Sequence, residues 1–258
     1  MSSSLNSSEL SFYKKEGFIV IENLFSYKEI HIIKESIQIS IENLLTNITS
    51  GKTYFLDQKR FVDLDNQTIQ FEPKPHGDKI KVIEPAHCLN KELLKLVHDI
   101  RITDPIKSIL GTSKISLWTD KLNLKTPKSG SSFGWHQDSP YWVHDNEDVN
   151  RLPNAYLSLD DSNEKNGCFR VIRRSHTKGC LEGKDDGSQL GGFYTNPKCF
   201  DLADEVSFDL SAGSIVFFDP HIVHGSRENN SLKQRMAYIM TYQPGYRSML
   251  KENKVEKI

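Results

Sequence analysis

The sequence predicts an α+β protein, mainly β, whose body is a β-barrel or jelly roll. Helix-like segments fall within about the first 112 residues, and many short strand-like segments separated by turn-rich stretches follow them. Apolar residues make up 37 % of the 258 residues, so a sizeable core is possible. No repeat or linker-like change in composition divides the chain. We therefore expect one domain over residues 1–258, with a helical support over about 1–112 and the barrel core over about 113–245.

The segments before the barrel carry helix signals. Residues 9–16 are typical of a short helix ended by Gly17, and Phe18–Ile21 follow as a buried strand. Ser26 and Glu29 form a capping box, in which the serine accepts from the first helical turn and the glutamate reaches back. Apolar residues then recur at helical spacing to about residue 45, at Ile30, Ile33, Ile37 and Ile41.

Residues 46–80 are polar and interrupted by proline and glycine, so we expect a long loop there. Two short helices follow over about 90–99 and 104–110. Strand-like runs then cover residues 115–125, 154–161, 167–172, 205–210, 214–219 and 235–244. Asn166-Gly167 lies between two of these runs and predicts a hairpin.

Charge and cysteine content narrow the class of protein. The 33 lysines and arginines nearly balance the 34 aspartates and glutamates, which disfavours nucleic acid or a membrane surface as partner. The N-terminus lacks a basic region followed by an apolar core, and no run approaches the roughly 18 apolar residues of a membrane span. Four widely spaced cysteines indicate reduced thiols, at Cys88, Cys168, Cys180 and Cys199. We therefore expect a cytoplasmic protein.

The segment Gly134–Asp138 carries the most informative pair of residues. Positions two apart on an extended chain project to the same face, so His136 and Asp138 can both point into a barrel mouth. Joined by a distant histidine, they would form the facial triad of non-haem Fe(II) oxygenases, which leaves coordination positions free for a co-substrate and oxygen. A His-x-Asp pair alone is common by chance, and we interpret a second one, His76-Gly77-Asp78, as a solvated loop.

Two histidines, His221 and His224, are candidates for the third ligand. Arg235 lies 11 residues beyond His224 on the last predicted strand. An arginine there can bind the far carboxylate of a 2-oxoacid co-substrate with two parallel hydrogen bonds, as a lysine cannot, and Ser226 can add a hydroxyl. The same spacing counted from His221 falls on Leu232, which cannot bind a carboxylate, so we favour His224.

With these residues the chain resembles the phytanoyl-CoA dioxygenase family of Fe(II)/2-oxoglutarate oxygenases, from Glu16–Val20 to the strand around Arg235. The resemblance implies three iron ligands: His136, Asp138 and His224. It implies that 2-oxoglutarate is held by Arg235, Ser226, Lys81 and Asn229. Four residues that lie near the ligands in the sequence are candidates for substrate contact: Trp135, Gln137, Tyr141 and Trp142. For Trp135, a plain packing role is an equal alternative.

The resemblance also implies a fold and an activity. The fold is a double-stranded β-helix (a jelly-roll, cupin-like core) with N-terminal helices packed on it. The activity is hydroxylation of an unactivated C–H bond of a small-molecule substrate, using Fe(II), 2-oxoglutarate and O2, releasing succinate and CO2, and stimulated in vitro by ascorbate. The same chemistry can end in desaturation or ring closure in natural-product biosynthesis. The sequence leaves the substrate and the oligomeric state open.

Two alternatives belong to other classes of protein. A cupin-like binding protein or sensor would keep the barrel without turnover, but a decayed site should have lost a metal ligand, Ser226 or Arg235. A metal-dependent hydrolase could use His76, Asp78 and His87, but it would have no use for Arg235. Fe(II)-dependent decarboxylation of 2-oxoglutarate separates the dioxygenase from both.

Overall fold

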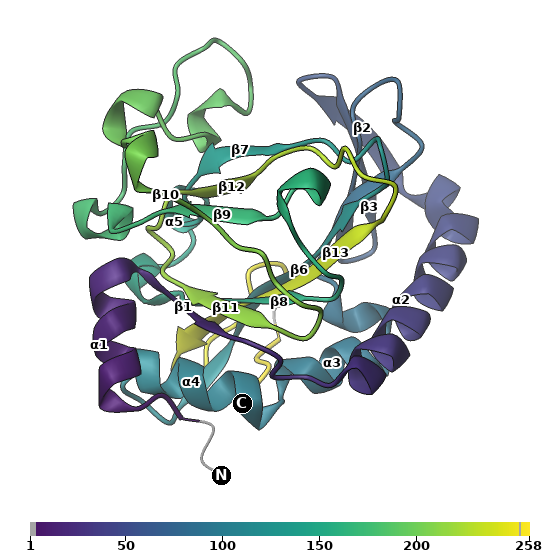
Figure 1. The fold of residues 1–258 in the computed structure, drawn as a ribbon. Coiled ribbons are helices and arrows are strands. Elements are labelled where there is room, and N and C mark those ends of the chain that lie inside the picture. Colours follow the sequence, from purple (N-terminus) through teal and green to yellow (C-terminus); the bar gives the residue numbers. More distant parts are fainter. Residues whose placement is uncertain (1–3, 253) are drawn as a thin grey trace.

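Two antiparallel sheets form the body of the protein in the computed structural model, which describes residues 4–252 and 254–258 (Figure 1). In chain order the larger sheet contains β1 (Phe18–Ile21), β2 (Lys52–Leu56), β3 (Lys59–Leu64), β4 (Gln67–Phe71), β5 (Ile80–Glu84), β6 (Ile115–Lys125), β8 (Asn154–Ser158), β11 (Ile215–Phe218) and β13 (Arg235–Pro244). The smaller sheet contains β7 (Phe133–His136), β9 (Phe169–Ile172), β10 (Glu205–Ser207) and β12 (His224–Ser226). The strand orders are β1-β11-β8-β13-β6-β5-β4-β3-β2 and β10-β9-β12-β7. This arrangement confirms the predicted α+β jelly roll.

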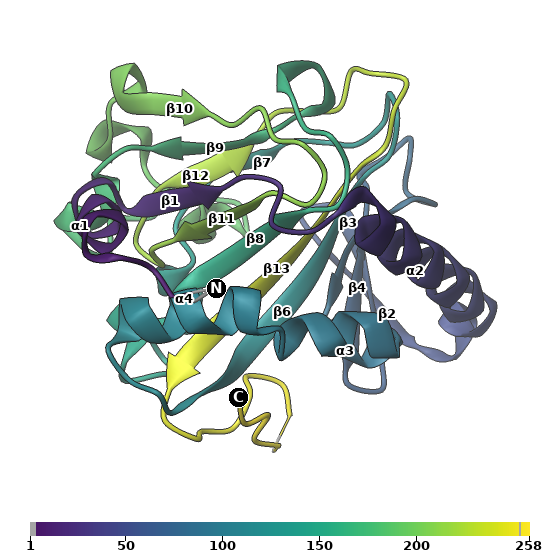
Figure 2. The same cartoon turned by 60° about the horizontal axis from the view of Figure 1, so that its bottom comes forward.

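Helices of the N-terminal half support the jelly roll: α1 (Ser7–Glu16), α2 (Tyr27–Asn47), α3 (Lys91–Val97) and α4 (Ile100–Leu110). The short α5 (Ser139–Trp142) follows β7 and lies by the cavity described below. Figure 2 shows α3 and α4 lying across β8, β13 and β6, on the face turned away from the smaller sheet. In the part of the chain that the structure describes, no helix is long and apolar enough to cross a membrane.

The predicted capping box starts α2. Ser26 Oγ accepts from the amide of Glu29 at 3.3 Å, and the Glu29 carboxylate accepts from the amide of Ser26 at 2.8 Å. Behind this cap the helix buries three of the four predicted isoleucines, Ile30, Ile33 and Ile37. The sequence signal therefore sets both where α2 begins and which face meets the sheet.

The alternation of side chains along β13 builds two cores. Met236, Tyr238, Met240 and Tyr242 point to the helices, whereas Ala237 and Ile239 point between the two sheets. All ten residues of β13 are buried, because one face of the strand packs on helices and the other on the smaller sheet. Each strand of this kind can therefore present a polar side chain to the space between the sheets without breaking the helix-facing core.

Two local predictions were wrong. Residues 46–80 are not a long loop, because β2, β3 and β4 form an antiparallel meander that extends the larger sheet. Asn166-Gly167 is not a hairpin turn, because β8 and β9 belong to different sheets. Gly167 has φ +74° and ends a short turn, and a side chain there would lie 2.3 Å from the carbonyl oxygen of Arg227. Because glycine has no side chain, it allows the two backbones to lie this close together.

The C-terminal segment, residues 245–252 and 254–258, returns along the start of β6. The amide of Leu117 donates to Glu256 O at 3.1 Å, and the amide of Ile258 donates to Ile115 O at 3.1 Å. Further along, the amide of Leu250 donates to Trp118 O at 2.9 Å. These bonds hold the segment against the jelly roll beside the cavity described below.

Candidate active site

The two short strands β7 and β12 place two imidazoles side by side. His136 ends β7, His224 begins β12, and the two residues are direct partners in the antiparallel pair. Their ring centroids lie 4.1 Å apart. Nδ1 of His136 lies 2.7 Å from Gly134 O, and Nδ1 of His224 lies 3.0 Å from Ile222 O. A carbonyl can only accept a hydrogen bond, so Nδ1 carries the proton in each ring. Nε2 is therefore unprotonated, and its lone pair can coordinate a metal.

Burial keeps both imidazoles neutral. Loss of water around the ring, with His224 close by, lowers the pKa of His136 to about 3. The pKa of His224 is also lowered, again chiefly by burial. Neutral imidazoles are the form that binds a metal ion.

Asp138 completes the group from the turn that follows β7. Its amide donates to Pro220 O at 3.1 Å, its Oδ2 accepts from Asn154 Nδ2 at 3.0 Å, and its Oδ1 lies 3.7 Å from Lys121 Nζ. Burial alone would raise the pKa of Asp138, but the charge of Lys121 and its contact with the carboxylate bring that pKa below its ordinary value. The carboxylate is therefore ionised at neutral pH.

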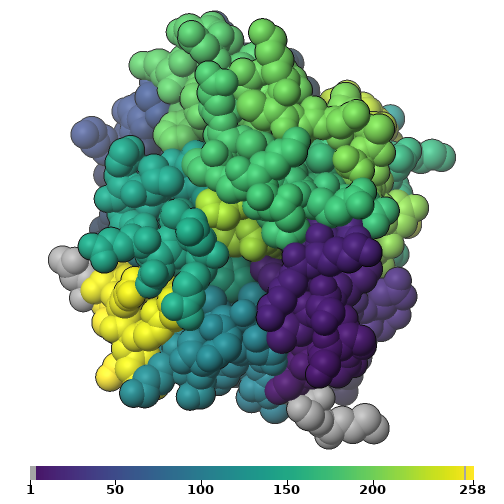
Figure 3. All heavy atoms as spheres, turned by 90° about the vertical axis from the view of Figure 1, so that its left-hand side faces the viewer, coloured from purple at the N-terminus to yellow at the C-terminus, as the bar shows by residue number. Residues whose placement is uncertain are grey.

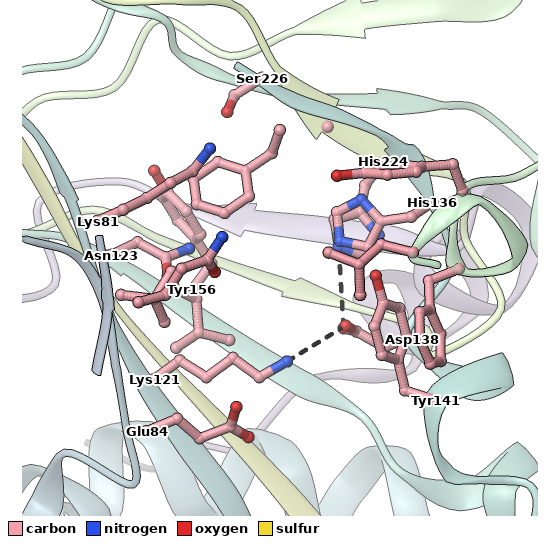
Figure 4. A pocket seen from close by; sticks show the side chains of 18 of the residues that line it. Lys81, Glu84, Lys121, Asn123, His136, Asp138, Tyr141, Tyr156, His224 and Ser226 are labelled. Carbon is pink, nitrogen blue, oxygen red and sulfur yellow. Dashed lines mark ion pairs between the residues drawn. The ribbon is translucent and has the colours of Figure 1, made fainter. Parts of the chain in front are cut away.

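The three side chains form a compact set of metal-ligating atoms. One atom each from His136, Asp138 and His224 lies within 4.8 Å of the other two. Figure 4 shows the three side chains converging on one side of a cavity. In residues 4–252 and 254–258 this is the one group of three or more His, Cys, Asp or Glu arranged in this way. Two nitrogens and one carboxylate oxygen are the donor set of a 2-His-1-carboxylate iron site.

The group faces a cavity of about 350 Å³ between the two sheets. Figure 4 shows Lys81 and Ser226 across the cavity from Asp138, and Lys121 reaching toward the Asp138 carboxylate. The charged residues that line the cavity are Lys59, Lys81, Lys121, Arg235, Lys251, Glu84, Asp138 and Asp145. Ligand cavities in proteins usually measure about 300–1,000 Å³, so this one suits small molecules.

Arg235, Lys81 and Ser226 form the basic end of the cavity. The buried Arg235 donates from its two terminal nitrogens to Tyr156 Oη at 3.0 Å and Gly167 O at 2.6 Å, while its Nε has no partner among the described residues. Lys81 Nζ donates to Ser131 Oγ at 2.6 Å. Burial, together with Lys59 and Arg235, lowers the pKa of Lys81 to about 8. An anion at this end of the cavity would offset the repulsion that lowers the pKa of Lys81.

Three of the predicted site residues lie away from the cavity. Trp135 points to the opposite face of β7 from His136 and packs on Phe200 and on the guanidinium of Arg170. The buried Gln137 donates from its side-chain amide to the backbone carbonyls of Gly179 and His221, so the amide holds two loops in place. Asn229 donates to Lys125 O at 3.0 Å and Lys233 O at 2.8 Å and shapes the turn before β13. We therefore assign no substrate or co-substrate contact to these three side chains.

Tyr141 and Trp142 do line the cavity, and so do residues that sequence reasoning missed. The missed residues include Lys121 and Glu84, and also Leu250 and Lys251 of the C-terminal segment. A signal for Lys121 was present, because Lys121, Asn123 and Lys125 alternate with Leu122 and Leu124 along one strand. No comparable signal marked Leu250 and Lys251, whose position depends on how the chain returns after β13.

The rival ligands are engaged elsewhere. His221 contacts Ser139 Oγ at 2.7 Å and Asn150 Oδ1 at 2.8 Å through its two ring nitrogens. His87 is buried and contacts Asp120 Oδ1 at 2.7 Å. The exposed turn that carries His76 and Asp78 does not form a metal-ligating group with it in the part of the chain that the structure describes.

Comparison with known proteins gives one family. Residues 13–237 match the family model described as "Phytanoyl-CoA dioxygenase (PhyH)". The chain is 25 % identical over 256 residues to an ectoine dioxygenase of Bordetella bronchiseptica, covering 92 % of this chain and 75 % of the relative. It is 26 % identical over 253 residues to a phytanoyl-CoA dioxygenase of Arabidopsis thaliana, covering 91 % and 87 %.

Solved structures agree on the fold. EctD from S. alaskensis, in a crystal structure with 2-oxoglutarate and 5-hydroxyectoine, superposes with a TM-score of 0.69 at 21 % identity, covering 93 % of this chain and 76 % of that one. The carbocyclase SnoK from nogalamycin biosynthesis superposes with a TM-score of 0.67 at 16 % identity, covering 95 % and 86 %. The match to the family model over most of the jelly roll and its support confirms the resemblance seen in the sequence. The chain therefore belongs to the phytanoyl-CoA dioxygenase (PhyH) family of non-haem iron, 2-oxoglutarate-dependent dioxygenases.

Proposed function

We propose that the protein uses Fe(II), 2-oxoglutarate and O2 to hydroxylate an unactivated C–H bond of a small-molecule substrate, releasing succinate and CO2. The observation that carries the proposal is the convergence of His136, Asp138 and His224 within 4.8 Å, beside a cavity whose other side is basic. The relatives support it, since they include dioxygenases named for ectoine and for phytanoyl-CoA.

The residues fit the iron ion that this proposal requires. Both imidazoles are neutral with Nε2 unprotonated, and the carboxylate is ionised, so none of the three must lose a proton on binding. His136, Asp138 and His224 would hold the ion, each through one ligand atom. Bound there, iron supplies the activation of oxygen, coupled to oxidative decarboxylation of 2-oxoglutarate, that hydroxylation needs.

The basic end fits the co-substrate. The Arg235 fork offers paired donors to a carboxylate, with the Ser226 hydroxyl and the Lys81 ammonium beside it in the cavity wall. Burial excludes water from Arg235 and strengthens its attraction for an anion. These residues bind and orient the co-substrate, while the aromatic wall made by Tyr141 and its stacking partner Phe193 confines the substrate.

Hydroxylation is the reaction that the named relatives favour, since they include an L-proline trans-4-hydroxylase of Streptomyces griseoviridis, 25 % identical over 182 residues. Desaturation and ring closure would use the same residues. Mass spectrometry separates the outcomes, because hydroxylation adds one oxygen atom and the other two remove a pair of hydrogens.

The experiment that tests the proposal is Fe(II)-dependent turnover of 2-oxoglutarate. We expect purified protein with Fe(II) and ascorbate to release succinate and CO2 slowly even without a second substrate, and a metabolite library to yield compounds that accelerate this release. A protein that binds 2-oxoglutarate without releasing succinate would instead be the cupin-like binding protein. Absence of both binding and turnover would contradict the proposal altogether.

A further inference from the structure

The cations that line the cavity differ in how their hydrogen-bond donors are used. Lys59 Nζ donates to Tyr194 Oη at 3.0 Å, Lys251 Nζ donates to Thr68 Oγ1 at 2.7 Å, and Lys81 and Arg235 have the partners described above. Lys121 Nζ has no partner at hydrogen-bond length among the described residues, and Asp138 Oδ1 lies 3.7 Å from it. Its side chain, 23 % exposed, lines the cavity. Lys121 therefore brings unused donors to the cavity beside the metal-ligating group.

The surroundings of Lys121 favour an anion in that position. Its Nζ lies 5.3 Å from the ring centroid of Trp142 and 5.9 Å from that of Tyr141, so apolar rings flank the ammonium. Ion pairs are stronger where apolar groups replace water. Two carboxylates face the ammonium: Asp138, with which it forms an ion pair at 3.7 Å, and Glu84, whose Oε1 accepts from Thr119 Oγ1 at 2.8 Å. Neither carboxylate is at hydrogen-bond length from Lys121 Nζ, so the donors of the ammonium remain free for a further anion.

Charge balance in the loaded cavity leads to the same conclusion. The cavity is lined by five cationic and three anionic side chains, an excess of two positive charges. The two positive charges of an Fe(II) ion and the two negative charges of 2-oxoglutarate cancel. The excess therefore remains to be balanced by the molecule that is oxidised. Lys121 is placed to meet that molecule, because Figure 4 shows it reaching to Asp138 at a distance from Lys81 and Ser226.

We infer that the substrate is a small molecule with an anionic group such as a carboxylate, and that Lys121 binds this group. The inference rests on the proposed function, because it concerns the substrate of the same site. The cavity of about 350 Å³ must hold the co-substrate as well, so the substrate is of the size of an amino acid or a short-chain acid. Its apolar part packs on Tyr141 and Trp142, and its anionic end fixes which C–H bond faces the metal.

The test compares carboxylates with their uncharged carboxamides. Benzoate, hexanoate and L-leucine, each with its primary carboxamide, are titrated into protein loaded with Fe(II) and 2-oxoglutarate under nitrogen. Binding is followed by the fluorescence of the tryptophans beside the cavity. We expect the wild-type protein to bind carboxylates at least about tenfold more tightly than the carboxamides, the usual value of one charge-assisted hydrogen bond. Equal binding of acid and amide across the panel would overturn the inference without reference to any variant.

Variants locate the effect at Lys121. Lys121→Met should weaken carboxylate binding at least about tenfold and leave carboxamide binding unchanged, while Lys121→Arg retains a preference for the acid. Lys74→Met is the control, since it removes an exposed lysine that does not line the cavity. We expect Lys74→Met to change carboxylate binding less than about twofold.

Two further readouts separate the other roles that Lys121 could have. If Lys121→Met lowers the affinity for Fe(II), the residue positions Asp138 and the inference is wrong. If it raises the KM for 2-oxoglutarate in succinate release without a second substrate, Lys121 binds the co-substrate and the inference is again wrong. Failure of the wild-type protein to release succinate at all would instead contradict the proposed function, while the comparison of acids with amides still reports on Lys121.

Discussion

At the scale of single residues, the orientation of two imidazoles prepares the proposed iron site. Each Nδ1 is fixed by the carbonyl of the residue two positions earlier, Gly134 for His136 and Ile222 for His224. Nε2 is therefore free in both rings, and both rings stay neutral because they are buried. His221 lies three residues before His224, but both of its ring nitrogens contact other side chains. The difference between the two histidines is thus one of hydrogen bonding.

This difference predicts opposite outcomes for two alanine variants. His224→Ala should abolish Fe(II) binding and 2-oxoglutarate turnover, because two ligands remain where three are needed. His221→Ala should keep the bound metal and substantial activity, since it loses contacts to Ser139 and Asn150 only. Metal content and succinate release are measured on both proteins. An inactive, metal-free His221→Ala protein beside an active His224→Ala protein would reverse our assignment of the third ligand.

The basic end gives a second prediction at this scale. Arg235→Lys should raise the KM for 2-oxoglutarate at least about tenfold, because a point charge replaces a fork that donates two parallel hydrogen bonds. Fe(II) affinity should stay unchanged, since Arg235 is not among the metal-ligating residues. Lys59→Arg, at a cavity cation bonded to Tyr194, is the control for general charge effects. Unaltered 2-oxoglutarate kinetics in Arg235→Lys would remove Arg235 from the co-substrate site.

At the scale of elements, the best-specified part of the support is the start of α2. The capping box satisfies amides that the first helical turn leaves without partners. Ser26→Ala should lower the free energy of unfolding by about 1 kcal/mol, as measured by urea denaturation. Ser50→Ala, at an exposed serine that donates to Asn47 O, should change that free energy by less than about 0.5 kcal/mol. Equal losses in the two variants would show that the cap contributes nothing of its own.

The elements also show how far the sequence could lead. Strong local signals, such as the isoleucine spacing of α2 and the apolar runs of β11 and β13, predicted helices and strands correctly. The meander β2–β4 was missed because two of its strands expose much of their surface and carry many charged and polar residues. The pairing of β4 with β5 joins residues that are distant in the sequence, so no local pattern predicts it. The hairpin predicted at Asn166-Gly167 was wrong for a related reason. The dipeptide is typical of hairpin turns, but here Gly167 is needed because its backbone lies close to the backbone of the distant Arg227.

The same contrast between local sequence signals and long-range folding applies to the site. The structure brings His136, Asp138, His224 and Arg235 to one cavity, as their pattern in the sequence led us to expect, and their roles as metal ligands and carboxylate anchor stay predictions. Residues near the ligands in sequence were weaker candidates, since alternate side chains of a strand point to opposite faces. Trp135 therefore turned away from the cavity, while Lys121 entered it from another strand.

At the scale of the whole molecule, a buried polar network joins the sheet core to the C-terminal segment. Asp120 accepts from the amide of His87 at 2.6 Å and from Tyr238 Oη at 2.8 Å, and His87 Nε2 lies 3.8 Å from Glu252 Oε1. Burial alone would lower the pKa of His87, but Asp120 and Glu252 raise it above its ordinary value of 6.5. The folded protein therefore favours the protonated imidazole more than the unfolded chain does.

This network makes stability depend on pH. Its contribution is fully present below pH 6.5, the value for the unfolded chain, and is lost as the pH rises through the higher pKa of the folded protein. We expect the urea midpoint of the wild-type protein to fall more steeply, as the pH rises above 6.5, than that of His87→Gln, which cannot titrate. Parallel pH profiles of the two proteins would show that His87 carries no such linkage.

The C-terminal segment has a practical consequence for protein engineering. It contributes Leu250 and Lys251 to the cavity wall, yet it contains no metal-ligating residue and no strand of either sheet. In Figure 3 it forms a patch on the surface, the yellow atoms at one edge of the molecule. Part of the cavity wall thus comes from a segment that lies outside both sheets. Leu250 and Lys251 can be varied to change the shape and charge of the cavity, while Met249 in the core, Glu252 beside His87 and the bridge between Ser116 and Lys257 are kept.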